Sequence, residues 1–204
     1  MIGRLSTALA GGIALCAVAV SAQAAPEIGK PAPTFAGKDS SGDTVNLGDL
    51  AGKTVVLEWT NHECPFVKKH YDSGNMQALQ KDLTGKGAVW LTVISSAPGK
   101  QGHVSPAEAD KLTASRKAAP TDVILDEDGK IGMAYGATAT PQMVVITPDQ
   151  KVAYMGAIDS IPSAKQDDIP KAQNYVRAAY DSVAAGKPVQ VAQTKAYGCS
   201  VKYQ

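Results

Sequence analysis

The sequence predicts an α/β domain in which helices flank a central mixed β-sheet. Two stretches, residues 54–59 and 88–94, have the continuous apolar character of buried strands, and a helical pattern follows each of them. Residues 143–147 and 152–156 then form a predicted hairpin across Pro148-Asp149-Gln150. Strand–helix–strand alternation that ends in a hairpin and a helix implies parallel and antiparallel strands in one sheet.

The first 24 residues have the pattern of an export signal rather than of a folded element. Arg4 supplies a positive start, residues 9–20 are apolar or small, and Ala22-Gln23-Ala24 fits a small-x-small cleavage site. The apolar stretch is short for a membrane span. We therefore expect residues 1–24 to be cleaved, the protein to be exported to the periplasm, and no membrane association to remain.

The mature chain is long enough for one domain with its own core. Removing 24 of the 204 residues leaves 180, which we divide into a domain at 25–187 and a tail at 188–204. The leader carries one Arg and no acid, so Lys+Arg falls from 20 to 19 against 19 Asp+Glu. A net charge near zero gives no general attraction to nucleic acid or anionic lipid, so we expect neither as a partner.

The first half of the domain contains an extended segment, a strand and a helix. Residues 25–45 are rich in Pro and Gly, which suits extended chain with a hairpin-like turn at 40–43. After the first buried strand, apolar residues at helical spacing predict a helix over 65–83. Gly74-Asn75 is expected to break or kink that helix.

The second half adds two helices and a short strand. Ser105-Pro106-Ala107-Glu108 is a capping box with Pro at the first helical position, and it predicts a helix that reaches about residue 117. Residues 123–125 form a short strand that a turn at 126–129 closes. A last helix is predicted over 169–185, with Gly186-Lys187-Pro188 ending it.

Cys64 is the residue that most strongly indicates chemistry. It follows the first buried strand and directly precedes Pro65, a favourable first residue of a helix. The first N–H groups of a helix lack hydrogen-bond partners, and the helix dipole is positive at this end. Both effects favour the thiolate over the thiol, and the thiolate is the reactive form. The mature chain keeps one more cysteine, Cys199, and two cysteines in an oxidising compartment favour a pair.

Several segments together resemble the thioredoxin superfamily. Within it they are most similar to the exported peroxiredoxin-like proteins, the redoxin or alkyl hydroperoxide reductase–thiol-specific antioxidant family. The resemblance covers about residues 26–204. Its segments are NHECPFVKKHY at 61–71, SSAPGKQG at 95–102, YGATATP at 135–141, GAID at 156–159 and AYGCSVKY at 196–203.

The resemblance implies a thioredoxin-like fold with a cis Pro141 that precedes the hairpin and faces a redox-active Cys64. It implies an antioxidant thiol oxidoreductase in which Cys64 reduces a hydroperoxide or a disulfide. Cys199 would act as the resolving thiol, and an external thiol reductant would restore the pair. We expect no cofactor and no resident metal. Four residues are expected to contact the substrate: Asn61, Thr140, Pro141 and Trp59.

Three positions depart from the family pattern. Val67 stands where thioredoxins have the second cysteine of Cys-x-x-Cys, so exchange within that motif is excluded. Typical peroxiredoxins have Thr or Ser three residues before the cysteine and Pro seven before it, where this chain has Asn61 and Leu57. The last two departures argue against a typical peroxidase site. The resemblance still makes a hydroperoxide the leading substrate, and thiol:disulfide exchange on periplasmic protein clients is the alternative.

Two non-enzymatic functions are further alternatives. Cys64 could handle copper together with His62 and His70, although a spacing of six residues turns positions 64 and 70 to different helix faces. A permanent Cys64–Cys199 disulfide could instead act as an inert staple, which the chain-entropy model values at about 4–5 kcal/mol.

The polar residues near Cys64 have competing interpretations. Arg116 is expected on the solvated face of a helix, and so is His70 with its neighbours Lys68 and Lys69. Glu58, if buried at the end of the central strand, would have a raised pKa and could relay a proton. For Trp59, packing beneath the site competes with contact to the substrate.

Overall fold

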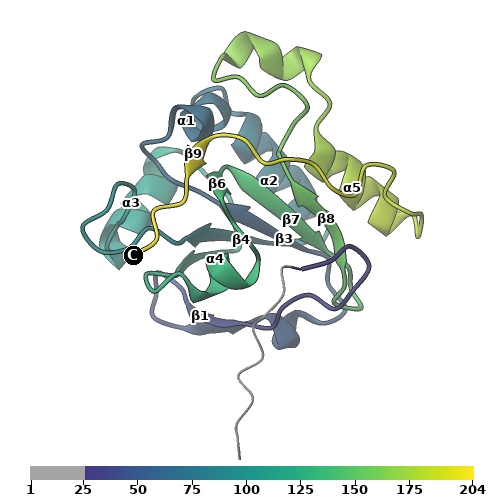
Figure 1. Cartoon of the computed structure of the whole chain (residues 1–204), viewed down its shortest axis with the longest axis horizontal. Helices are drawn as coiled ribbons and strands as arrows, with labels where there is room; N and C mark the ends of the chain where they lie inside the picture. The colour runs from purple at the N-terminus through teal and green to yellow at the C-terminus, as the bar shows by residue number, and fades with distance from the viewer. Residues whose placement is uncertain (1–25) are drawn as a thin grey trace, which may run out of the picture.

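A central five-stranded sheet organises the computed structural model, which describes residues 26–204; the expected export signal lies outside them. The strand order is β5–β4–β3–β7–β8, with β3, β4 and β5 parallel and β7 and β8 antiparallel to their neighbours (Figure 1). The bounds are Val55–Trp59 for β3, Val89–Ile94 for β4, Asp122–Leu125 for β5, Gln142–Ile146 for β7 and Val152–Gly156 for β8. The predicted mixed sheet is confirmed.

Both faces of the sheet are covered. On one face lie α1 (Pro65–Asp72), α2 (Asn75–Gly85) and α5 (Tyr175–Ala184), with α3 (Pro106–Ser115) over the β4–β5 end. On the other lie β1 (Ala36–Lys38), β2 (Thr44–Asn46), the 3-10 helix η1 (Leu47–Leu50) and α4 (Lys130–Ala134). Every residue of β3 is buried, because successive side chains of a central strand point into opposite cores. Val56 and Glu58 point to the face of α1, whereas Leu57 and Trp59 point to the other.

Local sequence signals account for most helix boundaries. The predicted break in the first helix is confirmed, since Gly74 has a φ of 77° between α1 and α2. The capping box of Ser105 and Glu108 is present at the start of α3. The short α4 was not predicted, because five residues carry little periodicity.

The predicted start of the last helix was wrong. The 3-10 helix η2 spans Gln166–Lys171 and contains Pro170, which cannot donate within a helix. The α-helix begins only at Tyr175, where the Asn174 side chain accepts the N–H of Arg177 at 2.9 Å.

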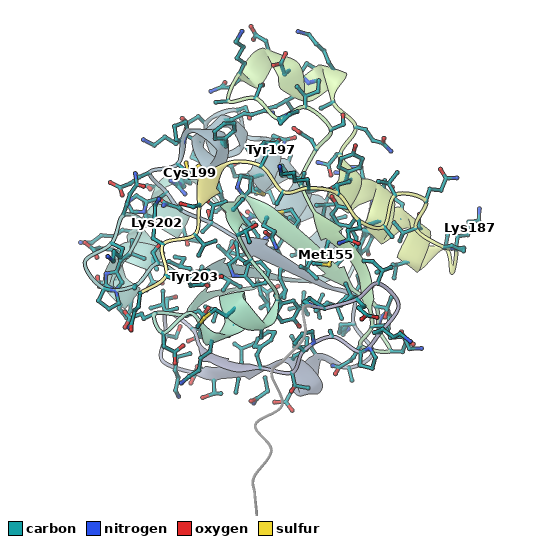
Figure 2. All side chains as sticks on the ribbon, viewed as in Figure 1. Met155, Lys187, Tyr197, Cys199, Lys202 and Tyr203 are labelled. Atoms are coloured by element: carbon teal, nitrogen blue, oxygen red, sulfur yellow. The ribbon has the colours of Figure 1, made fainter. Side chains whose placement is uncertain are left out.

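The tail after α5 is bound along the length of the domain (Figure 2). Met155 forms an isolated bridge with Gln193, and the Lys202 carbonyl accepts the N–H of Ala97 at 2.9 Å. Between these points, β9 (Cys199–Ser200) pairs antiparallel with β6 (Ala139–Thr140), beside the start of β7 (Figure 1). No helix within residues 26–204 has the length and apolar character needed to cross a bilayer.

Candidate active site

Cys64 lies where the chain leaves the central strand and enters α1. It is the N-cap of that helix, with an extended backbone, and its carbonyl accepts the N–H groups of Val67 and Lys68 at 3.0 and 2.9 Å. Pro65 fits the first helical position because no N–H is needed there. Cys64 is 0% exposed, and its side chain lies in the core between the sheet and α1. The predicted helix start is confirmed.

The loop before β7 contacts the Cys64 thiol. The Thr140–Pro141 peptide bond is cis, as predicted. The carbonyl of Thr140 accepts a hydrogen bond from Cys64 Sγ at 3.2 Å. Two segments that lie 76 residues apart in the chain therefore meet at one sulfur atom.

The tail brings Cys199 to the same place. In the β6–β9 pair Cys199 is the direct partner of Thr140, and the Thr140 hydroxyl donates to the Cys199 carbonyl at 3.3 Å. Both cysteines are free thiols, and the half-buried Cys199 packs against the core cluster that contains Cys64. Gly198 permits this approach: its φ is 132°, and a Cβ there would lie 1.9 Å from the Thr140 carbonyl oxygen.

The surroundings shift the pKa values of the two thiols in opposite directions. Burial acts to raise the pKa of Cys64, but hydrogen bonds from the Cys199 thiol and from the N–H groups of Val67 and Cys199 outweigh it, so the pKa lies below 9.0. Burial, then the hydrogen bond and charge of Cys64, raise the pKa of Cys199 to about 11. Cys64 is therefore the more acidic thiol of the pair and loses its proton first, whereas Cys199 keeps its proton at neutral pH.

Asn61 and Trp59 both lie inside the scaffold of the site. The Asn61 side chain accepts the N–H of Glu63 at 2.9 Å and donates to the carbonyl of Gln101 at 3.3 Å, which leaves the amide engaged at both ends. Trp59 is fully buried on the opposite face of the sheet, where its indole N–H donates to Ser95 at 3.1 Å. Thr140 and Pro141 are thus the predicted contact residues that the fold brings to the Cys64 thiol.

Glu58 is buried beneath α1, on the same face of β3 as the Cys64 core. Its carboxylate accepts hydrogen bonds from four side chains: Tyr71 at 2.9 Å, Trp90 at 2.9 Å, Gln80 at 3.2 Å and Thr92 at 3.3 Å. Burial raises the pKa of Glu58, although each of these donors acts in the other direction. The interpretation of Glu58 as a buried acid is the one that the structure supports.

Arg116 does not lie on a solvated face, contrary to the sequence-based expectation. Its guanidinium donates to the His62 carbonyl at 3.1 Å and lies 4.7 Å from the centre of the Tyr71 ring. It therefore ties the end of α3 to the loop that carries Cys64. Nothing in the local sequence pattern signals this contact, because it joins residues 54 positions apart.

Lys69 and His70 are buried as well, and this also corrects the expectation of a solvated helix face. Lys69 Nζ pairs with the carboxylate of Asp159 at 3.1 Å, with exposures of 0% and 4% for the two side chains. Asp159 also accepts the hydroxyl hydrogen of Tyr197, which belongs to the tail. A buried ion pair thus joins α1, the loop after β8 and the tail two residues before Cys199.

His70 takes part in this packing as a neutral ring. Its Nδ1 accepts the amide N–H of Asn75 at 2.8 Å, and burial lowers its pKa to about 4, so the ring is neutral. Within residues 26–204, no three His, Cys, Asp or Glu side chains converge as a set of metal ligands. The copper alternative therefore has no ligand set in the described part of the chain.

Comparisons with known proteins agree with this geometry. The model of the AhpC/TSA family matches residues 28–155, which include Cys64 and the cis proline but not the tail. A comparison with curated proteins gave no match.

Solved structures share the fold over 64–89% of this chain. An uncharacterized conserved protein from Geobacillus kaustophilus is 27% identical, with a TM-score of 0.73 over 87% of this chain and 93% of its own. A hypothetical protein from Sinorhizobium meliloti 1021 is 20% identical, with a TM-score of 0.74 over 89% and 97%. A putative thiol:disulfide interchange protein, DsbE, from Chlorobium tepidum is 24% identical, with a TM-score of 0.52 over 64% and 85%. The predicted thioredoxin-like fold is confirmed.

Proposed function

The chain belongs to the AhpC/TSA family of thiol oxidoreductases, and on that premise we propose that Cys64 reduces hydroperoxides with Cys199 as its resolving thiol. The observation that carries this proposal is the placement of Cys199 beside Cys64, with the pKa of one thiol lowered and that of the other raised. A thiolate next to a protonated thiol is the pair that the two steps of such a cycle need.

The first step is attack of the Cys64 thiolate on the terminal oxygen of the hydroperoxide. The O–O bond breaks, Cys64 becomes a sulfenic acid, and the departing alkoxide takes a proton to leave as an alcohol or water. In the second step the sulfur of Cys199 attacks the sulfenic sulfur, which forms the Cys64–Cys199 disulfide and releases water. An external dithiol then reduces this disulfide by exchange and is itself oxidised to a disulfide.

Burial of Cys64 favours a small oxidant over a folded protein. The residue is 0% exposed, and the chain's own tail pairs with the adjoining loop. A hydroperoxide needs access for two oxygen atoms, whereas a protein disulfide needs room for a second backbone. Thiol:disulfide exchange on protein clients is therefore the second candidate, and it requires the tail to move.

Location in an oxidising compartment fits the same cycle. A cysteine pair that a peroxide oxidises and an external dithiol reduces can operate in an oxidising compartment, and the leader-like pattern of residues 1–24 supports export. We therefore include the periplasm in the proposal.

Reaction with one equivalent of hydrogen peroxide tests the proposed peroxidase. We expect the two thiols to be lost together, and the intact mass to show an intramolecular disulfide. The reaction should be much faster than the oxidation of free cysteine by hydrogen peroxide. In Cys199→Ser, a sulfenic acid on Cys64 should accumulate and react with dimedone. Disulfide formation no faster than oxidation of free cysteine would contradict the peroxidase and leave disulfide exchange as the activity.

A further inference from the structure

The strand β9 occupies an edge at which an extended polypeptide could pair. The edge is β6, two residues long, directly before the cis proline and in contact with the Cys64 thiol. β9 pairs with it in antiparallel register, and the Val201 N–H donates to the Thr138 carbonyl at 3.2 Å. Addition of a strand to a free edge is a common way to bind an extended peptide, because main-chain hydrogen bonds hold any sequence. The tail of the protein itself thus makes the main-chain contacts with β6 that a bound peptide would make.

The tail also presents a sulfur atom where a bound substrate would need one. Cys199 is the residue that pairs with Thr140, whose carbonyl contacts Cys64 Sγ. Gly198 allows the tail backbone to lie close against Thr140, because it has no Cβ to overlap the Thr140 carbonyl oxygen. A peptide in the same register would place its own cysteine against Cys64. The tail segment around Cys199 therefore has the geometry of a bound peptide substrate, although it is part of the same chain.

Two tyrosines hold β9 at its ends. Tyr197 donates to Asp159, which Lys69 pairs with, and its ring lies 5.8 Å from the ring of Phe66. Tyr203 donates to the carbonyl of Ala137 at 2.7 Å. Figure 2 shows both tyrosines on the tail, on either side of Cys199. Burial raises the pKa of each hydroxyl, so both remain donors at neutral pH.

We propose that residues 197–201 are an internal occupant of the β6 edge, and that the hydroxyl groups of Tyr197 and Tyr203 form a latch that decides when this edge opens to an extended, disulfide-bearing polypeptide segment. The inference rests on the proposed reactivity of Cys64 and adds a recognition surface to it. The tail lies outside residues 28–155, the part of the chain that the family model matches.

The chemical step at the open edge is thiol–disulfide exchange. The Cys64 thiolate attacks the cysteine sulfur of the docked segment, a new Cys64–peptide disulfide forms, and the former partner of that sulfur leaves as a thiolate. No net oxidation occurs in this step. While the latch is closed, the edge is filled and Cys64 is covered, so exchange is limited by the fraction of molecules whose tail is released.

A synthetic peptide with the tail sequence AYGCSVKY tests this directly. Its cysteine is supplied as the mixed disulfide with thionitrobenzoate, so that attack by Cys64 releases coloured thionitrobenzoate. The protein carries Cys199→Ser, which leaves Cys64 as the sole thiol of the described residues. A second peptide is N-methylated at the valine that corresponds to Val201, which removes the N–H that Thr138 accepts. Ellman's reagent, which needs no strand pairing, reports the bare reactivity of Cys64.

Tyr197→Phe removes the hydroxyl but keeps the ring that packs on Phe66, and Tyr203→Phe does the same at the other end. We expect Tyr197→Phe to raise the rate with the peptide about tenfold, because a hydrogen bond to a charged group is lost, and Tyr203→Phe to raise it a few-fold. In both variants the unmodified peptide should react faster than the N-methylated one. Tyr180→Phe is the matched control, since its hydroxyl donates to the backbone carbonyl of Lys86 and not to a group of β6 or of the tail, and it should change nothing.

The possible results are distinct. Equal rates for the two peptides in both opened variants would overturn the docking edge, and rates for Tyr197→Phe and Tyr203→Phe equal to those of Tyr180→Phe would overturn the latch. In either case, reaction with Ellman's reagent would still support the proposed reactivity of Cys64. Failure of both Ellman's reagent and hydrogen peroxide to react with Cys64 in every folded variant, as judged by circular dichroism, would overturn the proposed function together with this inference.

Discussion

Cys199 lies directly opposite Thr140 in the antiparallel pair of β6 and β9, and that pairing determines where its sulfur lies. The Thr140 carbonyl already accepts a hydrogen bond from Cys64, so one residue of the cis-proline loop contacts both cysteines. The second thiol is therefore held by the backbone, through strand pairing, and does not depend on a neighbouring position in a Cys-x-x-Cys motif.

Replacement of Cys199 should change the pKa of Cys64 according to what replaces it. Cys199→Ala removes the side-chain donor that most strongly lowers that pKa, so the pKa should rise and alkylation by iodoacetamide at pH 7 should slow several-fold. Cys199→Ser keeps a hydroxyl donor, so the pKa of Cys64 in this variant should stay closer to that of the parent protein. Alkylation rate against pH measures both variants. Identical profiles for the two would show that Cys199 does not stabilise the thiolate.

Substitution of Gly198 should disturb the position of Cys199. In Gly198→Ala the new Cβ would overlap the Thr140 carbonyl oxygen, so β9 has to move off the edge. We expect a loss of about 1–3 kcal/mol in the free energy of unfolding, from the strained φ, and at least a tenfold slower formation of the Cys64–Cys199 disulfide. Urea unfolding and thiol titration after peroxide measure the two effects.

Gly186→Ala is the matched control for that variant. Gly186 also has a positive φ, 65°, but a Cβ there meets nothing within 4 Å. It should cost about 1 kcal/mol in unfolding free energy and leave the rate of disulfide formation unchanged. A rate that falls equally in both variants would mean that backbone strain, and not the contact with Thr140, is responsible.

The buried pair of Lys69 and Asp159 should be important for stability. Lys69→Met leaves the Asp159 carboxylate buried without its cation, and removal of one partner of a buried pair costs about 3–5 kcal/mol. Thermal and urea unfolding measure this loss. Lys86→Met is the control: its pair with Asp82 is exposed, so its loss should have little effect on unfolding. Similar losses for the two variants would contradict the structural role of the buried pair.

The sequence predicted the strands, the helix break at Gly74 and the position of Cys64, because local patterns of apolar residues, glycine and proline decide these features. It did not predict that Lys69 and Arg116 are buried or half-buried. Their partners, Asp159 and the His62 carbonyl, are 90 and 54 positions away, and periodicity within a helix carries no information on such contacts. The pairing of β9 with β6 was missed for the same reason, since two-residue strands have no pattern of their own.

Glu58 should make stability depend on pH in a defined direction. Its pKa in the folded protein is raised above the ordinary 4.5, so the folded state binds this proton more tightly than the unfolded state does. The stability that Glu58 contributes is then fully present below pH 4.5 and is lost as the pH rises through the raised folded value. Glu58→Gln cannot ionise, and its amide oxygen can still accept from Trp90 while the Tyr71 hydroxyl turns to accept its N–H. Urea unfolding from pH 4 to pH 8 should therefore show the variant gaining stability relative to the parent as the pH rises. A difference between the two proteins that stays constant, or that changes in the opposite direction, would contradict a raised pKa at Glu58.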